Sequence, residues 1–353
     1  MTSFPLFVVP FCLGVVLLVV FSVWKYVRWI RQFSKKQHLV VRKNIFSLKF
    51  VPALWEMFRE GLLHWRIAKK NWLLGYMHRS LAFGWFLLIV VGAVQARLAF
   101  PHGHPFYEAI FFNYFESRAN EDFQFAYTHF FSNLMDLILL YVFSGLGLAV
   151  LKKFWSRPLG MKKTTKHSLI DRIAKATLWC IFPIRLLSES ITAALYGNGG
   201  FLVVGIGRLL GSTQLPLALL EYPCWLLYSV DVGLFFALMP FSRYMHIFTE
   251  PLLIYFRQLG VREGENKSGY TLFELSACAR CGICIDGCPV NRELGITDTQ
   301  GVDLLKALRN KEVFRKAEDI AESCMMCANR LHLRFFHCLF HPTQSLQEVF
   351  CFL

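Results

Sequence analysis

The chain has 353 residues, of which 55% are hydrophobic and 35 are phenylalanine. This composition, with a mean hydropathy of +0.41, excludes an ordinary soluble globular protein. A net charge of +14 could suggest nucleic-acid binding, but the basic residues lie in loops between apolar segments, where the positive-inside rule and anionic lipid headgroups account for them. We therefore expect a multi-pass protein of the lipid bilayer, with no nucleic-acid partner.

Five apolar stretches are long enough to cross a bilayer, which takes about 20 helical residues. The first lies within residues 1–24 and is followed by Lys25, Arg28 and Arg31, which predicts a transmembrane anchor with its N-terminus outside. The basic, aromatic segment 25–73 is expected to lie along the cytoplasmic face as interfacial helices. Residues 74–251 are expected to hold the other four spans, at about 74–98, 127–151, 170–196 and 222–241.

The glycine-rich segment 197–220 is also moderately apolar. A sixth crossing there would place the C-terminal cysteines outside, against the distribution of lysine and arginine. We expect an outer-surface or re-entrant segment instead. The predicted location is the inner (cytoplasmic) membrane, with the C-terminal part in the cytoplasm.

A cysteine motif, C-x2-C-x2-C-x3-C-P, follows a tether expected over residues 252–269. Its spacing is typical of bacterial-type [4Fe–4S] proteins, in which the fourth cysteine ligates a second cluster. Zinc and a disulfide pair are the alternatives, but zinc motifs rarely show this spacing and disulfides are unusual in a cytoplasmic domain. The four cysteines are Cys278, Cys281, Cys284 and Cys288.

A second motif starts at Cys324 and Cys327, but arginine stands at positions 330 and 334, where further ligands are expected. Helical periodicity between the two motifs predicts an α-helical ferredoxin-type domain over residues 270–327. Either Cys338 is a displaced ligand, or the atypical tail 328–353 is out of frame or truncated, and we favour the second explanation. One or two clusters are therefore expected, with at most one stably bound, by the first three cysteines.

Two histidines are expected at the same depth near the cytoplasmic side. His78 lies near the start of the second span, and His246 lies at or just beyond the end of the fifth. Two imidazoles at one depth on facing helices are what bis-histidine haem b ligation requires. Interfacial histidines without a metal are an equal alternative. His129 has no such partner and is expected to be structural or quinone-facing.

Three acids, Asp136, Glu189 and Asp231, are expected about 10–14 Å inside the outer face, at 1.5 Å per helical residue. Charged groups at such depth are functional candidates. Arg185 is one turn from Glu189 and is its expected partner. We predict that these groups handle quinone protons, the alternative being that Arg185 and Glu189 only neutralise each other.

The segments M-H-x4-F-G-W-F-L-L around His78 and M-P-F-S-R-Y-M-H-I-F-T-E-P around His246, with the first cysteine motif, carry a family resemblance. Over residues of about 70–327 the chain resembles membrane iron–sulfur proteins related to heterodisulfide reductase, whose membrane part is similar to the nitrate reductase gamma subunit. The resemblance implies haem b on His78 and His246, a quinone that we expect to be menaquinone, and two cubane clusters on the cysteines of both motifs. It also implies a separate cytoplasmic iron–sulfur subunit with cysteine-cysteine-glycine repeats.

The predicted fold is all-α: a five-helix transmembrane bundle followed by a small α-helical ferredoxin-like domain. The predicted function is electron transfer, as the subunit of an oxidoreductase, between quinone and the iron–sulfur clusters. A membrane polyferredoxin that assembles respiratory enzymes without quinone chemistry is the competing hypothesis. Bound haem separates the two.

Overall fold

The computed structural model describes residues 5–100, 105–118, 127–154, 168–262 and 269–278. Every regular element in these ranges is a helix, which confirms the all-α class for this part of the chain. The predicted ferredoxin-type domain lies outside the described residues apart from its first few positions. The cysteines outside them are Cys281, Cys284, Cys288, Cys324, Cys327 and Cys338.

Within the described ranges, five helical stretches are long and apolar enough to span a membrane, which supports a multi-pass protein in a lipid bilayer. They are Leu6–Arg31, Trp72–Ala99, Thr128–Lys152, Leu169–Tyr196 and Leu217–Phe241. In order, their helices are α1 (Val9–Arg31, after the short turn η1, Leu6–Val8), α5 (Trp72–Ala99), α7 (Thr128–Phe154), α8 (Leu169–Tyr196) and α10 (Leu217–Leu238, followed by η4, Met239–Phe241).

The segment 197–220 contains the helix α9 (Phe201–Gly211) and the first four residues of α10. Eleven helical residues extend about 16 Å, which is too short to cross a hydrocarbon core of about 30 Å. The prediction that this segment is not a sixth crossing is therefore confirmed. α9 packs against α8 and α7.

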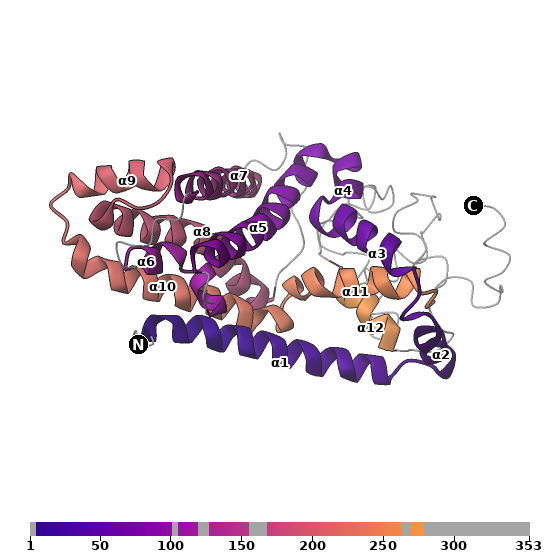
Figure 1. The fold of residues 1–353 in the computed structure, drawn as a ribbon. Helices are drawn as coiled ribbons and strands as arrows, with labels where there is room; N and C mark the ends of the chain where they lie inside the picture. The colour runs from indigo at the N-terminus through magenta and orange to yellow at the C-terminus, as the bar shows by residue number, and fades with distance from the viewer. Residues whose placement is uncertain (1–4, 101–104, 119–126, 155–167, 263–268, 279–353) are drawn as a thin grey trace.

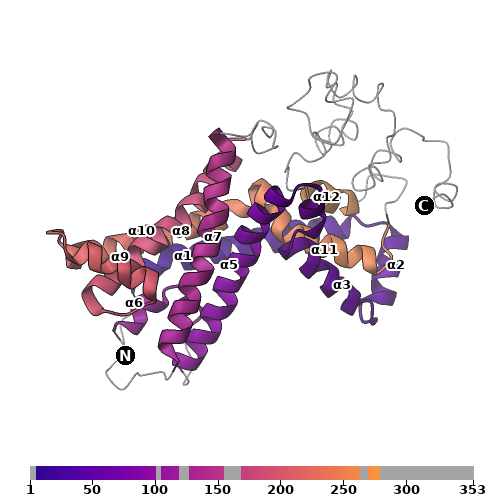
Figure 2. The same ribbon diagram turned by 90° about the horizontal axis from the view of Figure 1, so that it is seen from above.

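The spanning helices form two groups. α10 packs against both α1 and α8, and α5 pairs with α7; Figure 2 shows the α5–α7 pair crossing α1. Buried aromatic side chains such as Phe111, Trp225 and Phe235 fill the core between the groups. Large apolar side chains stay exposed along α1, among them Leu13, Val16 and Val20, as expected for helices that face lipid rather than water.

α1 and α10 cross with their backbones in contact. A Cβ atom on Gly14 would overlap the backbone of Gly233, and one on Gly233 would overlap the backbone of Pro10. Nearby, the Phe11 amide donates to the Ser229 hydroxyl at 3.1 Å. Small residues let two membrane helices bring their backbones into contact, so both glycines are required at this crossing.

The remaining elements gather at the two ends of the spanning helices (Figures 1 and 2). One end, named the N-terminal end here because α1 starts there, carries η3 (Phe106–Ala109), α6 (Phe112–Glu116) and α9. The other end, named the basic end here for its lysines and arginines, consists of the segment from α2 to α4 and the chain after α10. Its elements are α2 (Lys35–Asn44), α3 (Phe50–Met57), η2 (Phe58–Leu62), α4 (Trp65–Lys70), η5 (Arg243–Met245), α11 (His246–Gln258) and α12 (Gly269–Ser276).

An aromatic cluster holds the basic end together. Phe33, Phe256, Tyr270 and Phe273 are buried in it and join the end of α1 to α11 and α12. The first part of the predicted tether, residues 252–258, is therefore the second half of a packed helix. α12 leads directly to Cys278, so the start of the cysteine motif is anchored on the membrane domain.

Candidate functional site

His246 begins α11, directly after the turn η5. Its Nδ1 lies 2.7 Å from the carbonyl oxygen of Arg243. A carbonyl only accepts hydrogen bonds, so Nδ1 carries the proton and Nε2 keeps its lone pair. Burial lowers the pKa of His246 to about 4, so the ring is neutral at physiological pH. This is the form in which a histidine, oriented by a backbone carbonyl, ligates a metal.

His78 lies in the second turn of α5. Its Nε2 is fully buried and has no hydrogen-bond partner within the described structure. A buried polar atom left unpaired costs about 1–3 kcal/mol, and a bound group is one explanation for such an atom. His246 lies within electrostatic range of His78. The structure thus brings the two predicted haem ligands into one neighbourhood from helices far apart in sequence.

A third imidazole, missed in the sequence, belongs to the same neighbourhood. His64 stacks on His78 with ring centroids 5.5 Å apart and an interplanar angle of 29°. In the described part of the chain it is the only residue other than glycine with a positive φ, 49°. It follows η2, a single turn of π-helix. Both features are enriched at functional sites.

These histidines do not form a conventional metal-ion site. Across the described ranges, no three or more histidine, cysteine or acidic residues lie close enough to hold a metal ion. Haem needs only two axial nitrogens from the protein. His78 and His246 fit that requirement because each offers an Nε2 with no hydrogen bond to a described residue. His129 is exposed on the first turn of α7 and lies within electrostatic range of Glu116, at the N-terminal end.

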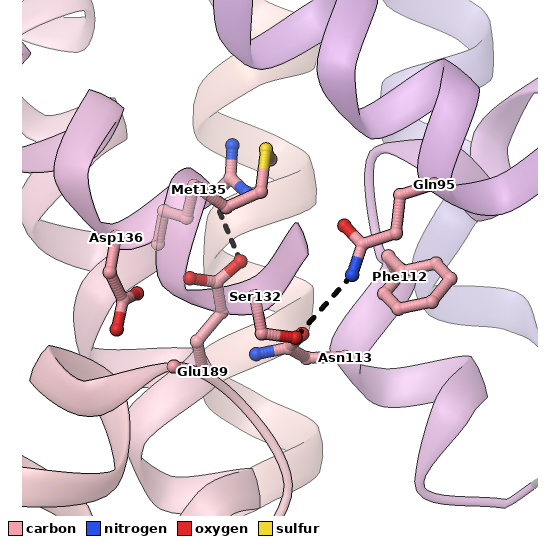
Figure 3. Close-up of a pocket in the computed structure, with 9 residues that line it drawn as sticks. Gln95, Phe112, Asn113, Ser132, Met135, Asp136 and Glu189 are labelled. Carbon is pink, nitrogen blue, oxygen red and sulfur yellow. Dashed lines mark hydrogen bonds and ion pairs between the residues drawn. The ribbon is translucent and has the colours of Figure 1, made fainter. Parts of the chain in front are cut away.

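The N-terminal end contains a small polar cavity between α5, α6, α7 and α8 (Figure 3). Its volume is about 10 Å³, which is room for about one water molecule. Arg185 donates to Glu189 there at 2.9 Å, so the predicted pairing is confirmed. The residues lining the cavity are Gln95, Phe112, Asn113, Ser132, Met135, Asp136, Arg185, Glu189 and Gly200.

Asp136, on α7, also forms hydrogen bonds with the start of α9. Its carboxylate accepts hydrogen bonds from the backbone amides of Leu202, at 2.7 Å, and Val203, at 3.2 Å. These are among the amides that a helix leaves unpaired at its start, so Asp136 acts as a cap supplied by another helix. A Cβ on Gly200 would overlap this carboxylate. The capping role was missed in the sequence, where Asp136 was considered only as a proton carrier.

Asp231 does not line the cavity. It lies on α10 within electrostatic range of Cys180 on α8, and its Oδ2 is buried without a hydrogen-bond partner among the described residues. The three predicted outer acids therefore do not form a single cluster, because only Asp136 and Glu189 share the cavity.

A second polar network at the N-terminal end was not predicted. Arg118 pairs with Glu221 at 2.7 Å, and the same carboxylate accepts from the Thr192 hydroxyl at 2.8 Å. Trp225 donates to that hydroxyl at 2.9 Å. The network connects the segment after α6 to α8 and α10. Each of its four side chains is hydrogen-bonded or ion-paired to another member of the network.

No protein-family model matches this chain, and no curated protein or solved structure matches it either. The resemblance to membrane iron–sulfur proteins related to heterodisulfide reductase therefore stays a prediction. It is based on the segments around His78 and His246 and on the first cysteine motif.

Proposed function

We propose that the chain is a membrane-anchored electron-transfer subunit that connects the quinone pool, through haem b, to [4Fe–4S] clusters. The clusters serve a cytoplasmic iron–sulfur subunit with cysteine-cysteine-glycine repeats. The basic end faces the cytoplasm in this proposal, because lysine and arginine are concentrated in its segments. The observation that carries the proposal is the convergence of His78 and His246 with both Nε2 atoms unengaged by described residues.

In this proposal His78 and His246 would hold the haem through their Nε2 atoms. The bound haem supplies one-electron chemistry, while the protein holds the ligands and tunes their surroundings. The Arg243 carbonyl fixes the ring of His246. The stacking of His64 restricts the rotation of His78.

The position of the first cysteine supports the route from haem to cluster. α11 starts at His246, and α12, which packs against α11 and α1, ends two residues before Cys278. The same pair of packed helices thus carries one candidate haem ligand and leads to the first candidate cluster ligand. No flexible linker separates the end of α12 from the cysteine motif.

The competing function is a polyferredoxin that assembles respiratory enzymes. Visible spectra of the purified, dithionite-reduced chain separate the two functions. A reduced b-type spectrum is expected for the quinone-linked subunit. A preparation with bound clusters and no haem would favour the assembly factor.

On the quinone side, we propose that Glu189 and Asp231 handle protons, because each is a buried acid in a spanning helix. Glu189→Gln and Asp231→Asn are each expected to slow quinol-driven haem reduction at least several-fold in stopped-flow measurements. Asp136→Asn is a poor test of proton transfer, since it also weakens the cap of α9. Unchanged rates in both amide variants would remove these acids from the proposal.

The broken second motif gives a prediction for cluster content. Arginine at position 330 cannot ligate iron, so the second cubane keeps at most three thiolates. Iron and sulfide analysis of anaerobically reconstituted protein is expected to give about four non-haem irons per chain, one cubane cluster. About eight would show that the tail supplies the missing ligands.

A further inference from the structure

Glu250 lies on α11 one turn after His246, beyond the last spanning helix. Its side chain is half-buried. Unlike other acids at the basic end, it makes no hydrogen bond or ion pair with any residue that the structure describes. An acid in such a position has lost solvation without gaining a partner, which disfavours its charged form.

A second carboxyl group increases this effect. Glu60 lies on η2, which packs against α11. It is 6% exposed and well compensated, because it pairs with Arg59 at 2.8 Å and with Arg66 at 3.4 Å. The Arg66 amide also donates to it at 3.2 Å. The carboxylate of Glu60 in turn opposes ionisation of Glu250.

The other charged groups around α11 are largely engaged with one another. Glu56 on α3 binds Arg66 at 3.2 Å and Gln258 at 2.6 Å. Glu274 on α12 lies 4.0 Å from Arg257. The guanidinium of Arg243 on η5 donates to the hydroxyl of Tyr244 at 3.4 Å. Burial and Glu60 outweigh the opposing effects of Arg257 and Arg66, and raise the pKa of Glu250 to about 7.

We infer that Glu250 is a proton-binding group of the basic end, coupled to the neighbouring histidine site. His246 is four residues away on the same helix, about 6 Å along its axis. A group held and reduced at that site would add negative charge, which would favour the protonated form of the Glu250 carboxyl. A hydronium ion of the solvent at the basic end supplies the proton: one of its O–H bonds breaks, the O–H bond of Glu250 forms, and a water molecule is left. Only this coupling depends on the proposed function.

The first test needs no haem. In infrared difference spectra of the full chain in nanodiscs, between about pH 5 and pH 9, a protonated-carboxyl band is expected that disappears with a midpoint of about 7. Glu250→Gln removes the part of this band that Glu250 contributes. The control is Glu56→Gln on α3, an acid with two hydrogen-bonded partners, which retains it. Identical spectra for the wild type and Glu250→Gln would overturn the inference.

Thermal unfolding gives a second readout with a defined sign. The pKa of Glu250 is higher in the folded chain than its ordinary value of 4.5, so the folded state binds more protons across that window. Stability contributed by the protonated form is therefore present at about pH 4.5 and is lost as pH rises through about 7. Glu250→Gln is expected to raise the melting temperature at pH 8 more than at pH 5. A uniform shift, or the opposite trend, would contradict the inference.

Redox titration tests the coupling. With haem bound, the midpoint potential of the wild type is expected to fall by up to about 59 mV per pH unit near neutrality, and Glu250→Gln flattens this slope. An equal slope in both proteins overturns the coupling while leaving proton binding intact. A chain that binds no haem contradicts the proposed function, and the infrared and unfolding tests still decide whether Glu250 binds the proton.

Discussion

Replacing His78 or His246 by alanine is expected to abolish the low-spin b-type spectrum of the purified protein, while the chain still inserts and folds. Each residue supplies one axial nitrogen in the proposed site, so either change leaves at most one ligand of the original pair. Visible and EPR spectra at equal protein concentration are the measurement. His129→Ala is the matched control, because that histidine is exposed on α7 at the other end of the molecule.

The third imidazole requires one further variant. His64 stacks on His78, so it is the residue placed to replace a missing ligand. If His78→Ala retains a bis-histidine spectrum, the double variant with His64→Gly is expected to lose it. Glycine adopts the left-handed backbone of His64 without strain, so this change removes the ring and leaves the turn intact. A bis-histidine spectrum that survives in His246→Ala and in the double variant would exclude the proposed ligands.

Replacing Gly233 by leucine is expected to separate α1 from α10 and to prevent accumulation of folded protein. A side chain at this position meets backbone atoms of Pro10 and Phe11, which cannot rotate away. Overpacking of a well-packed contact typically costs about 1–3 kcal/mol, and a rigid backbone collision is at the upper end or beyond. Fluorescence-detected size-exclusion chromatography after heating measures the loss.

Gly205→Leu provides the control, because a Cβ built on Gly205 meets open space beyond its own stretch of helix. The alanine pair sharpens the comparison, since alanine in a helix is favoured over glycine by about 1 kcal/mol. Gly205→Ala should therefore stabilise the chain slightly, whereas Gly233→Ala destabilises it. Equal effects at the two positions would show that α1 and α10 do not pack through these glycines.

The spanning helices could be predicted because hydrophobicity and length determine them. The fifth was expected over residues 222–241 and is observed over Leu217–Phe241; the error is at its start, where Glu221 is accommodated by Arg118 and Thr192. The Arg185–Glu189 pair followed from helical spacing alone. Such features depend on local sequence.

Features that depend on how the helices face one another could not be predicted in the same way. Depth along a helix places Asp136, Glu189 and Asp231 at similar heights, but not on the same side of the bundle, and Asp231 is outside the cavity. The capping of α9 by Asp136 depends on a contact between α7 and α9. His64 reaches His78 only through a π-helical turn and a left-handed residue, which no residue pattern specified.

The contact of α1 with α10 and α12 has a consequence for biosynthesis. α1 is synthesised long before α10 and α12, which are its main partners. Gly14 and the aromatic end of α1 therefore remain without these contacts until α10 and α12 have been made. The backbone amide of Gly269 then donates to the carbonyl oxygen of Gln32 at 3.1 Å. This hydrogen bond connects the end of α1 to the start of α12, the helix that precedes Cys278. A chain interrupted before α10 would therefore leave α1 without its main helix partner in the membrane.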